Sequence, residues 1–92
     1  MKKKIIARCF IKKECVEAFK AQAAALIPKT RSEEGCLFYS LFQDVSSPGE
    51  FLFYEEYRDQ AAVDAHLKSE YLGRHRANTK QMQSKETIVD II

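Results

Sequence analysis

The chain has 92 residues, of which 46% are hydrophobic and 30% are charged, as in an ordinary globular protein. Its 15 basic and 13 acidic residues are scattered along the sequence, so no basic stripe favours nucleic acid as a partner. No apolar run approaches the roughly 20 residues that a membrane helix needs, so no membrane partner is expected. We expect a single domain, residues 1–92, which is short enough to gain stability from a second copy.

The first residues resemble the charged start of a signal peptide, but Arg8 interrupts the apolar stretch that follows and favours a strand instead. The three cysteines, Cys9, Cys15 and Cys36, lack the spacing of a zinc site or a disulfide framework. We therefore expect reduced thiols and a cytoplasmic location. The sequence also has no Gly-rich dinucleotide fingerprint, phosphate loop or spaced metal ligands, so neither a cofactor nor a metal is expected.

Residues 3–11 alternate as in a strand, with one side formed by Ile5, Ala7, Cys9 and Ile11 and the other by Ile6, Arg8 and Phe10. From Glu14 onward, apolar residues recur at the spacing of an amphipathic helix. We expect Pro28 to kink or end this helix, because it has no N–H to donate. Whether the helix resumes over residues 30–32 stays open, and Gly35 is a natural C-terminal stop.

Two strands, Cys36–Gln43 and Phe51–Arg58, should form an antiparallel hairpin, because the residues between them are typical turn formers. Their alternation places Phe38 and Phe42 on one face with Cys36, and Tyr39 on the other with its apolar neighbours. Both faces of the hairpin are thus apolar. Since the chain has too few helices to cover both faces, the pattern predicts a homodimer.

Asp59 stands where a helix N-cap belongs, ahead of a short helix over Gln60–Leu67. Ser69 can cap a further helix whose apolar stripe includes Leu72 and His75, and Thr87–Ile92 reads as a last strand. The order β-α-β-β-α-α-β predicts an α+β, ferredoxin-like fold, an antiparallel sheet with helices on one face.

Two stretches, Glu34–Tyr39 and Phe53–Leu67, resemble the antibiotic biosynthesis monooxygenase family. They share its acidic residue and glycine before an aromatic strand, its strand ending in Glu-x-aromatic, its Asp-capped helix and its Ala-His-Leu-like run. The resemblance implies a dimeric α+β barrel in which two ferredoxin-like sheets pack face to face. It also implies a cofactor-free monooxygenase that oxidises a quinol or polycyclic phenol, a small aromatic substrate, with O2.

Other activities share this fold, and fold does not fix function. Haem-degrading members use an Asn, a Trp and a His, whereas this chain has no Trp and its first strand offers Arg8 in place of an Asn. The second hypothesis is an isomerase or a non-catalytic binder of a small polar metabolite, phosphorylated ones included. It would make Arg8, Arg58 or Arg74 essential and leave the aromatic residues incidental.

For the aromatic substrate, His66 is the leading candidate for the catalytic base, because imidazole can take a phenolic proton near neutral pH. Tyr39 and Tyr54 could orient a substrate oxygen through their hydroxyls, or serve only as core aromatics. The remaining candidates for substrate contact are Glu56, Arg8, Tyr71 and His75. Glu55 and Glu56 point to opposite sides of their strand, and we expect Glu55 to be the surface charge.

Overall fold

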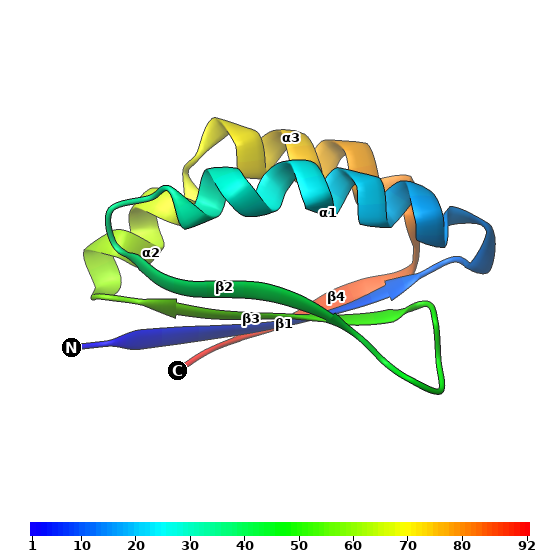
Figure 1. The fold of residues 1–92 in the computed structure, drawn as a ribbon, viewed down its shortest axis with the longest axis horizontal. Helices are drawn as coiled ribbons and strands as arrows, with labels where there is room; N and C mark the ends of the chain where they lie inside the picture. Colours follow the sequence, from blue (N-terminus) through cyan, green and yellow to red (C-terminus); the bar gives the residue numbers. More distant parts are fainter.

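The computed structural model describes residues 1–92 and has the predicted element order. The elements are β1 (Lys3–Ile11), the 3-10 turn η1 (Lys13–Cys15), α1 (Val16–Arg31), β2 (Cys36–Gln43), β3 (Glu50–Tyr57), α2 (Gln60–Leu67), α3 (Glu70–Thr79), the 3-10 turn η2 (Lys80–Met82) and β4 (Gln83–Ile91). The expected ferredoxin-like α+β fold is confirmed (Figure 1). None of the helices has the length and apolar character needed to span a membrane.

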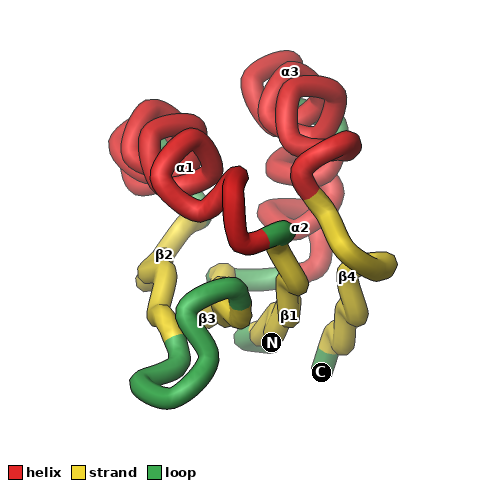
Figure 2. Tube along the Cα trace, turned by 90° about the vertical axis from the view of Figure 1, so that its right-hand side faces the viewer, coloured by secondary structure: helices red, strands yellow, loops and turns green.

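The four strands form one antiparallel sheet in the order β2-β3-β1-β4. Both long helices, α1 and α3, lie on the same side of this sheet, and no element covers the other side (Figure 2). We call the two sides the helix face and the open face. The chain ends meet at one end of the sheet, where the Lys4 amide donates to the Ile92 carbonyl at 3.0 Å.

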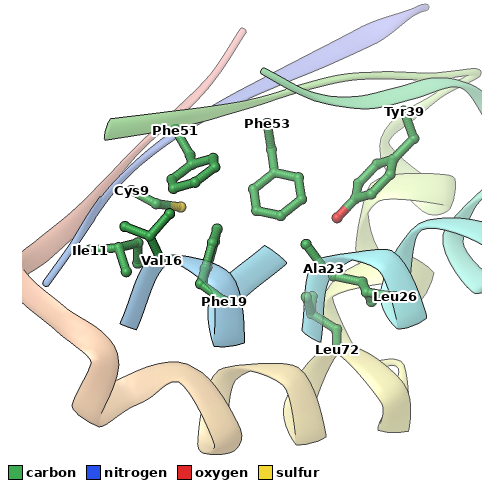
Figure 3. Packing of buried hydrophobic residues seen from close by; sticks show 10 residues of the cluster. All are labelled: Cys9, Ile11, Val16, Phe19, Ala23, Leu26, Tyr39, Phe51, Phe53 and Leu72. Carbon is green, nitrogen blue, oxygen red and sulfur yellow. The ribbon is translucent and has the colours of Figure 1, made fainter. Parts of the chain in front are cut away.

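The main core lies between the helix face and α1, where ten buried residues pack together (Figure 3). Phe19 of α1 is at its centre, with its ring centroid 4.9 Å from that of Phe51 and 6.5 Å from that of Phe53. The alternation predicted for β1 is confirmed, because Ile5, Cys9 and Ile11 are all buried on this side. Burial of these large apolar side chains supplies most of the stability that holds α1 on the sheet.

Helix α1 continues through Pro28 to Arg31, so of the two expected outcomes, a kink or an end at the proline, the end is wrong. A proline this close to the C-terminus removes only one helical hydrogen bond, and buried residues on either side, Leu26 and Thr30, anchor the last turn. Gly35 does not act as a left-handed stop either, since no residue has a positive φ. Its role is spatial, because a Cβ at this position would lie only 2.3 Å from Cβ of Ala62 in α2.

The hairpin contains a register shift that the alternation alone did not predict. Cys36 pairs with Tyr57 while Phe38 pairs with Glu56, so Leu37 is the extra residue of a β-bulge. Cys36 therefore faces the helices together with Tyr57, and the prediction that it shares a face with Phe38 is wrong. The apolar character of both hairpin faces is nevertheless present, as Phe38 remains 44% exposed on the open face.

The C-terminal elements follow their sequence signals closely at α2 and less closely at β4. Helix α2 has the predicted bounds, and Oδ1 of Asp59 accepts a 2.9 Å hydrogen bond from the Ala62 amide, as expected of an N-cap. Strand β4 begins at Gln83, four residues before the predicted start at Thr87. The added residues are mostly polar and exposed on an edge strand, so they lack the apolar alternation that would reveal a strand.

Candidate functional site

A cavity of about 150 Å³ lies between the helix face of the sheet and the helices. Its lining is mostly apolar and includes Phe19, Phe53 and Leu72. An apolar cavity of about this volume is known to hold one benzene molecule, so the space suits a single six-membered ring. A hydrophobic pocket with a few polar groups is the usual form of a small-molecule site.

Among the polar side chains that line this cavity, three come from three different elements: Tyr39 from β2, Glu55 from β3 and His66 from α2. The rings of Tyr39 and His66 lie 5.8 Å apart, and Nε2 of His66 lies 3.6 Å from Oε1 of Glu55. Burial raises the pKa of the Tyr39 hydroxyl, and nearby Glu55 adds to this effect, so the phenol stays protonated. The structure thus brings two predicted catalytic residues, Tyr39 and His66, together.

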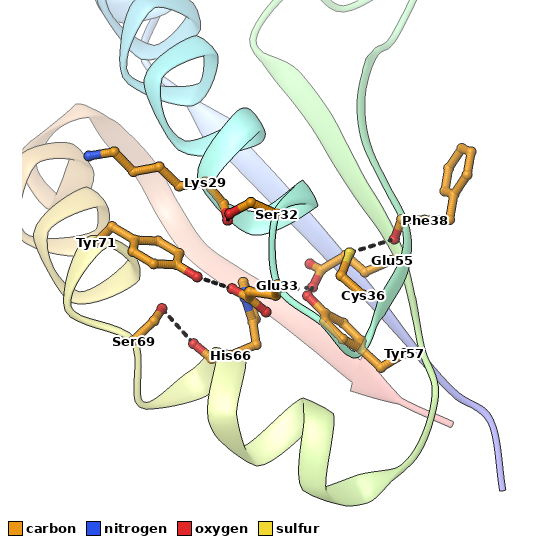
Figure 4. Close-up of polar contacts among 10 residues, drawn as sticks. All are labelled: Lys29, Ser32, Glu33, Cys36, Phe38, Glu55, Tyr57, His66, Ser69 and Tyr71. Carbon is orange, nitrogen blue, oxygen red and sulfur yellow. Dashed lines mark hydrogen bonds and ion pairs between the residues drawn. The ribbon is translucent and has the colours of Figure 1, made fainter.

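The His66 ring lies between two carboxylates, although it is only 2% exposed (Figure 4). Its Nδ1 lies 3.0 Å from Oε2 of Glu33, a residue of the loop between α1 and β2. The distance from Nε2 to Glu55 exceeds that of a hydrogen bond, so the bond to Glu33 fixes the ring. Because a carboxylate oxygen only accepts, Nδ1 carries the proton and Nε2 directs its lone pair towards Glu55 and the cavity.

Glu55 is buried, with 4% of its surface exposed, so the expectation that it is a surface charge is wrong. It lies on β3 between Phe53 and Tyr57 in the alternation, and both of these residues face the helices. Burial raises the pKa of the Glu55 carboxyl, while the hydrogen bond from Tyr57 and the proximity of His66 oppose this rise. A carboxyl of this kind beside an imidazole is typical of an active site.

Glu33 is a functional candidate that the sequence reasoning missed, because a charged loop residue carries no periodic signal. Its Oε2 accepts a hydrogen bond from the hydroxyl of Tyr71 in addition to its contact with His66 (Figure 4). Burial, together with the bond to Glu33, raises the pKa of Tyr71 to about 12. Tyr71 does not line the cavity, so the structure places it behind His66 and not against a ligand.

Three of the predicted site residues lie on the open face, away from His66. The Tyr54 hydroxyl donates to Oε2 of Glu56 at 2.7 Å, and Lys2 contacts Oε1 of the same carboxylate at 3.2 Å. Arg8 is exposed, with its guanidinium 5.4 Å from the centre of the Phe10 ring. The parity of their strands separates these residues from the cavity, so the structure does not bring Tyr54, Glu56 and Arg8 together with His66.

His75 of α3 lines the same cavity at a different place along β3. Its ring lies 5.9 Å from that of Phe19 and 6.1 Å from that of Phe53, and only 9% of the residue is exposed. Burial lowers the pKa of this imidazole. Nδ1 of His75 is buried without a hydrogen-bond partner, which is uncommon for a buried polar atom.

The lining of the cavity offers little positive charge to an anionic ligand. Arg76 is the one arginine that lines the cavity. Arg58 forms an ion pair with Glu34, and Arg74 forms one with Glu70. No group of three or more His, Cys, Asp or Glu side chains is arranged to hold a metal ion. The chemistry that these side chains offer is therefore proton transfer beside an apolar, ring-sized space.

The sequence pattern of the antibiotic biosynthesis monooxygenase family matches residues 4–78. The chain belongs to this family. It is 30% identical over 88 residues to the "Putative monooxygenase Rv0793" of Mycobacterium tuberculosis, a match that covers 96% of this chain and 86% of the relative. The solved structure of Rv0793 has a TM-score of 0.94 with 28% identity and covers 100% of this chain and 93% of its own. A crystal structure described as an antibiotic biosynthesis monooxygenase has a TM-score of 0.93 with 37% identity, covering 98% of this chain and 95% of its own.

A further relative, sll1783 of Synechocystis, is 31% identical over 81 residues, and the chain spans just over half of that protein, 55% of its length. The antibiotic biosynthesis monooxygenase pattern includes Glu33, Glu55, His66 and His75 and ends before β4. The cavity-lining residues of β4, Gln83, Thr87 and Val89, lie beyond it.

Proposed function

We propose that the protein is a cofactor-independent monooxygenase that oxidises a quinol with molecular oxygen. The observation that supports this proposal best is the position of His66, which lines a small apolar cavity together with its neighbour Glu55. A cavity of about 150 Å³ suits one ring better than a polycyclic phenol. The family membership makes a monooxygenase reaction the natural choice of chemistry.

The proposed reaction begins with the loss of a phenolic proton to Nε2 of His66. The resulting phenolate is electron-rich enough to reduce O2 directly, and the apolar walls keep water away from the intermediate. One oxygen atom enters the ring and the other leaves as water, so that a hydroquinone and O2 become a hydroxyquinone and water. All four electrons that reduce O2 come from the substrate.

Four of the polar residues that line the cavity have a role in this proposal. Glu55 stabilises the imidazolium that forms when Nε2 of His66 takes the proton, because opposite charges attract strongly in a buried site. The unpartnered Nδ1 of His75 binds the second oxygen of the quinol. Tyr39 orients the ring through its hydroxyl, which stays protonated and can donate.

The second hypothesis, an isomerase or binder of a small anionic metabolite, has less support. It requires free cationic groups at the cavity, and of the arginines considered for it Arg8 lies on the open face while Arg58 and Arg74 form ion pairs elsewhere. Arg76 alone offers a positive charge at the cavity lining. The apolar walls of the cavity would also have no role in binding a phosphorylated sugar.

We also propose that the open face is covered by a second copy of the chain. Large apolar side chains are half exposed on two of its strands, with 44% for Phe38 and 52% for Phe42 on β2 and 45% for Ile88 on β4. Burying such a face in both protomers would create an interface of about 2,000 Å² or more, the size of a permanent homodimer. The two ferredoxin-like sheets would then pack face to face.

The decisive test measures oxygen uptake with a panel of hydroquinones, comparing the wild type with His66→Ala. We expect turnover to fall roughly 10²–10⁴-fold in the variant, with a smaller change in KM, because the base is lost while the apolar walls remain. Lys68→Ala, an exposed position just after the same helix, serves as the control and should retain activity. Absence of protein-dependent oxygen uptake with any quinol, together with binding or isomerisation of a phosphorylated ketose, would instead establish the second hypothesis.

A further inference from the structure

We infer that Glu33 is a proton exit for the buried His66, carrying protons between Nδ1 of the ring and solvent. The expected effect on turnover rests on the proposed function. The proton path itself does not depend on it. Glu33 does not line the cavity and belongs to the loop between α1 and β2. It would therefore act through His66, as a positioning residue that also receives a proton.

The path is a row of three side chains that runs from the surface to the cavity. The side chain of Glu33 is 16% exposed, that of His66 is 2% exposed and that of Glu55 is 6% exposed. Oε2 of Glu33 is 3.0 Å from Nδ1, and Nε2 on the other edge of the ring is 3.6 Å from Glu55. Of the two carboxylates that flank the ring, Glu33 is the one with more access to water.

No other side chain competes with Glu33 for the ring. The remaining titratable or charged groups packed around His66 and its two carboxylates make no hydrogen bond to the imidazole; they are Tyr39 and Cys36 of β2, Tyr57 of β3, and Tyr71 and Arg76 of α3. Tyr71 instead donates to the same Oε2 that faces Nδ1, which fixes the carboxylate against the ring. A proton that leaves Nδ1 therefore passes to Glu33.

The proton balance explains why such an exit is useful. When Nε2 takes a proton from the substrate, the ring becomes a cation in a buried place, which is costly unless the charge is compensated or removed. Transfer of the Nδ1 proton to Glu33 leaves the ring neutral again, with one proton gained at Nε2 and one lost at Nδ1. Glu33 then releases its proton to water. The reverse transfers return a proton when reduced oxygen leaves as water.

Glu33→Gln is the central variant for a test, because the amide retains an oxygen for Tyr71 and His66 but does not accept a proton. Glu34→Gln is the matched control: it removes the same charge one residue away, from a side chain that is 91% exposed and paired with Arg58. The direct measurement is the exchange of the His66 Nδ1 proton with water, followed by NMR on 15N-histidine-labelled protein. The chain has only two histidines, so a His75→Phe sample assigns the signals.

We expect the Nδ1 proton to exchange at least tenfold more slowly in Glu33→Gln than in wild type or Glu34→Gln. Glu33→Asp restores a carboxylate and should exchange faster than Glu33→Gln. With a quinol substrate, kcat should fall roughly tenfold to hundredfold in Glu33→Gln while KM stays nearly constant, by analogy with the loss of the carboxylate partners of metal-binding histidines.

Equal exchange rates in wild type and Glu33→Gln would overturn the inference, as would a Glu33→Asp variant that exchanges no faster than Glu33→Gln. The inference would also fail if the slow exchange accompanied movement of the proton from Nδ1 to Nε2, because Glu33 would then only hold the tautomer. The exchange experiment needs no substrate. A slowed exchange in a protein that oxidises no quinol would therefore leave the proton path intact and reject the proposed function alone.

Discussion

The hydroxyl of Tyr57 donates a 2.7 Å hydrogen bond to Oε1 of Glu55, two residues earlier on the same strand, and both residues are buried. Side chains two residues apart on a strand point to the same face, so this bond is built into the strand itself. It is the only hydrogen bond that Glu55 receives from another side chain. The same oxygen atom faces Nε2 of His66, so Tyr57 helps to place the carboxylate beside the ring.

Replacing Tyr57 by Phe should therefore destabilise the protein by about 1–3 kcal/mol, because a buried carboxyl loses its donor. The pKa of Glu55 should rise further, since the Tyr57 bond opposes the effect of burial. Urea unfolding at neutral pH measures the first effect. Tyr54→Phe is the control, because Tyr54 makes the equivalent bond to Glu56 on the open face and its loss should cost less than that of the buried bond. Equal losses in the two variants would contradict the buried role of Glu55.

His75 should make the stability of the protein depend on pH. Its pKa is lowered in the folded state, so the unfolded chain binds the proton more tightly and stability falls as pH drops through the ordinary value of about 6.5. We expect wild type to lose free energy of unfolding relative to His75→Phe between pH 8 and pH 5. Urea unfolding at several pH values measures this difference, in which the contributions of the other titrating groups largely cancel. A difference that stays constant with pH would refute the assignment.

Gly35 and Gly73 should respond in opposite ways to alanine. A Cβ at Gly35 would meet Cβ of Ala62 at 2.3 Å, whereas a Cβ at Gly73 meets nothing within 4 Å. We expect Gly35→Ala to cost about 1–3 kcal/mol by overpacking. Gly73→Ala lies inside α3 and should gain about 0.5–1 kcal/mol from helix propensity. Thermal or urea unfolding checks both, and Gly35→Ala combined with Ala62→Gly should lose less than the sum of the two single changes.

The open face should fail as a dimer interface when a charge is placed on it. Phe42→Lys puts an ammonium on a surface that must be desolvated, so we expect it to shift the protein from dimer to monomer. Val45→Lys adds the same charge in the hairpin loop, where the residue is fully exposed, and should leave the assembly unchanged. Light scattering at micromolar concentration distinguishes the two states. A wild-type protein that is already monomeric and well folded would refute the proposed assembly.

Local signals in the sequence predicted much of the fold. The N-cap at Asp59 and the alternation of β1 depend on neighbouring residues only, and both are observed. The alternation of β3 also places Glu55 on the same side as Phe53 and Tyr57, and this pattern indicates that Glu55 is buried. The expectation of a surface charge instead followed the general preference of charged side chains for solvent. The Leu37 bulge and the continuation of α1 past Pro28 depend on tertiary packing.

The site was predicted less completely, for a physical reason. His66 could be found because imidazole is chemically distinctive and stands in a recognisable segment. Glu33 reaches His66 across 33 residues of sequence, and only the folded chain brings the two together. Tyr54 and Tyr39 look equivalent in the sequence, yet the parity of their strands sends them to opposite faces of the sheet.

The cavity is walled on one side by β4, an edge strand whose residue Val89 lines the space and is still 50% exposed. Glu33, Glu55 and His66 sit on other elements and inside the stretch that defines the family, while β4 lies outside it. The groups proposed to handle protons and this wall thus belong to different elements, so a substitution in β4 can reshape the cavity without replacing any of those groups. This makes β4 the place to begin redesigning selectivity.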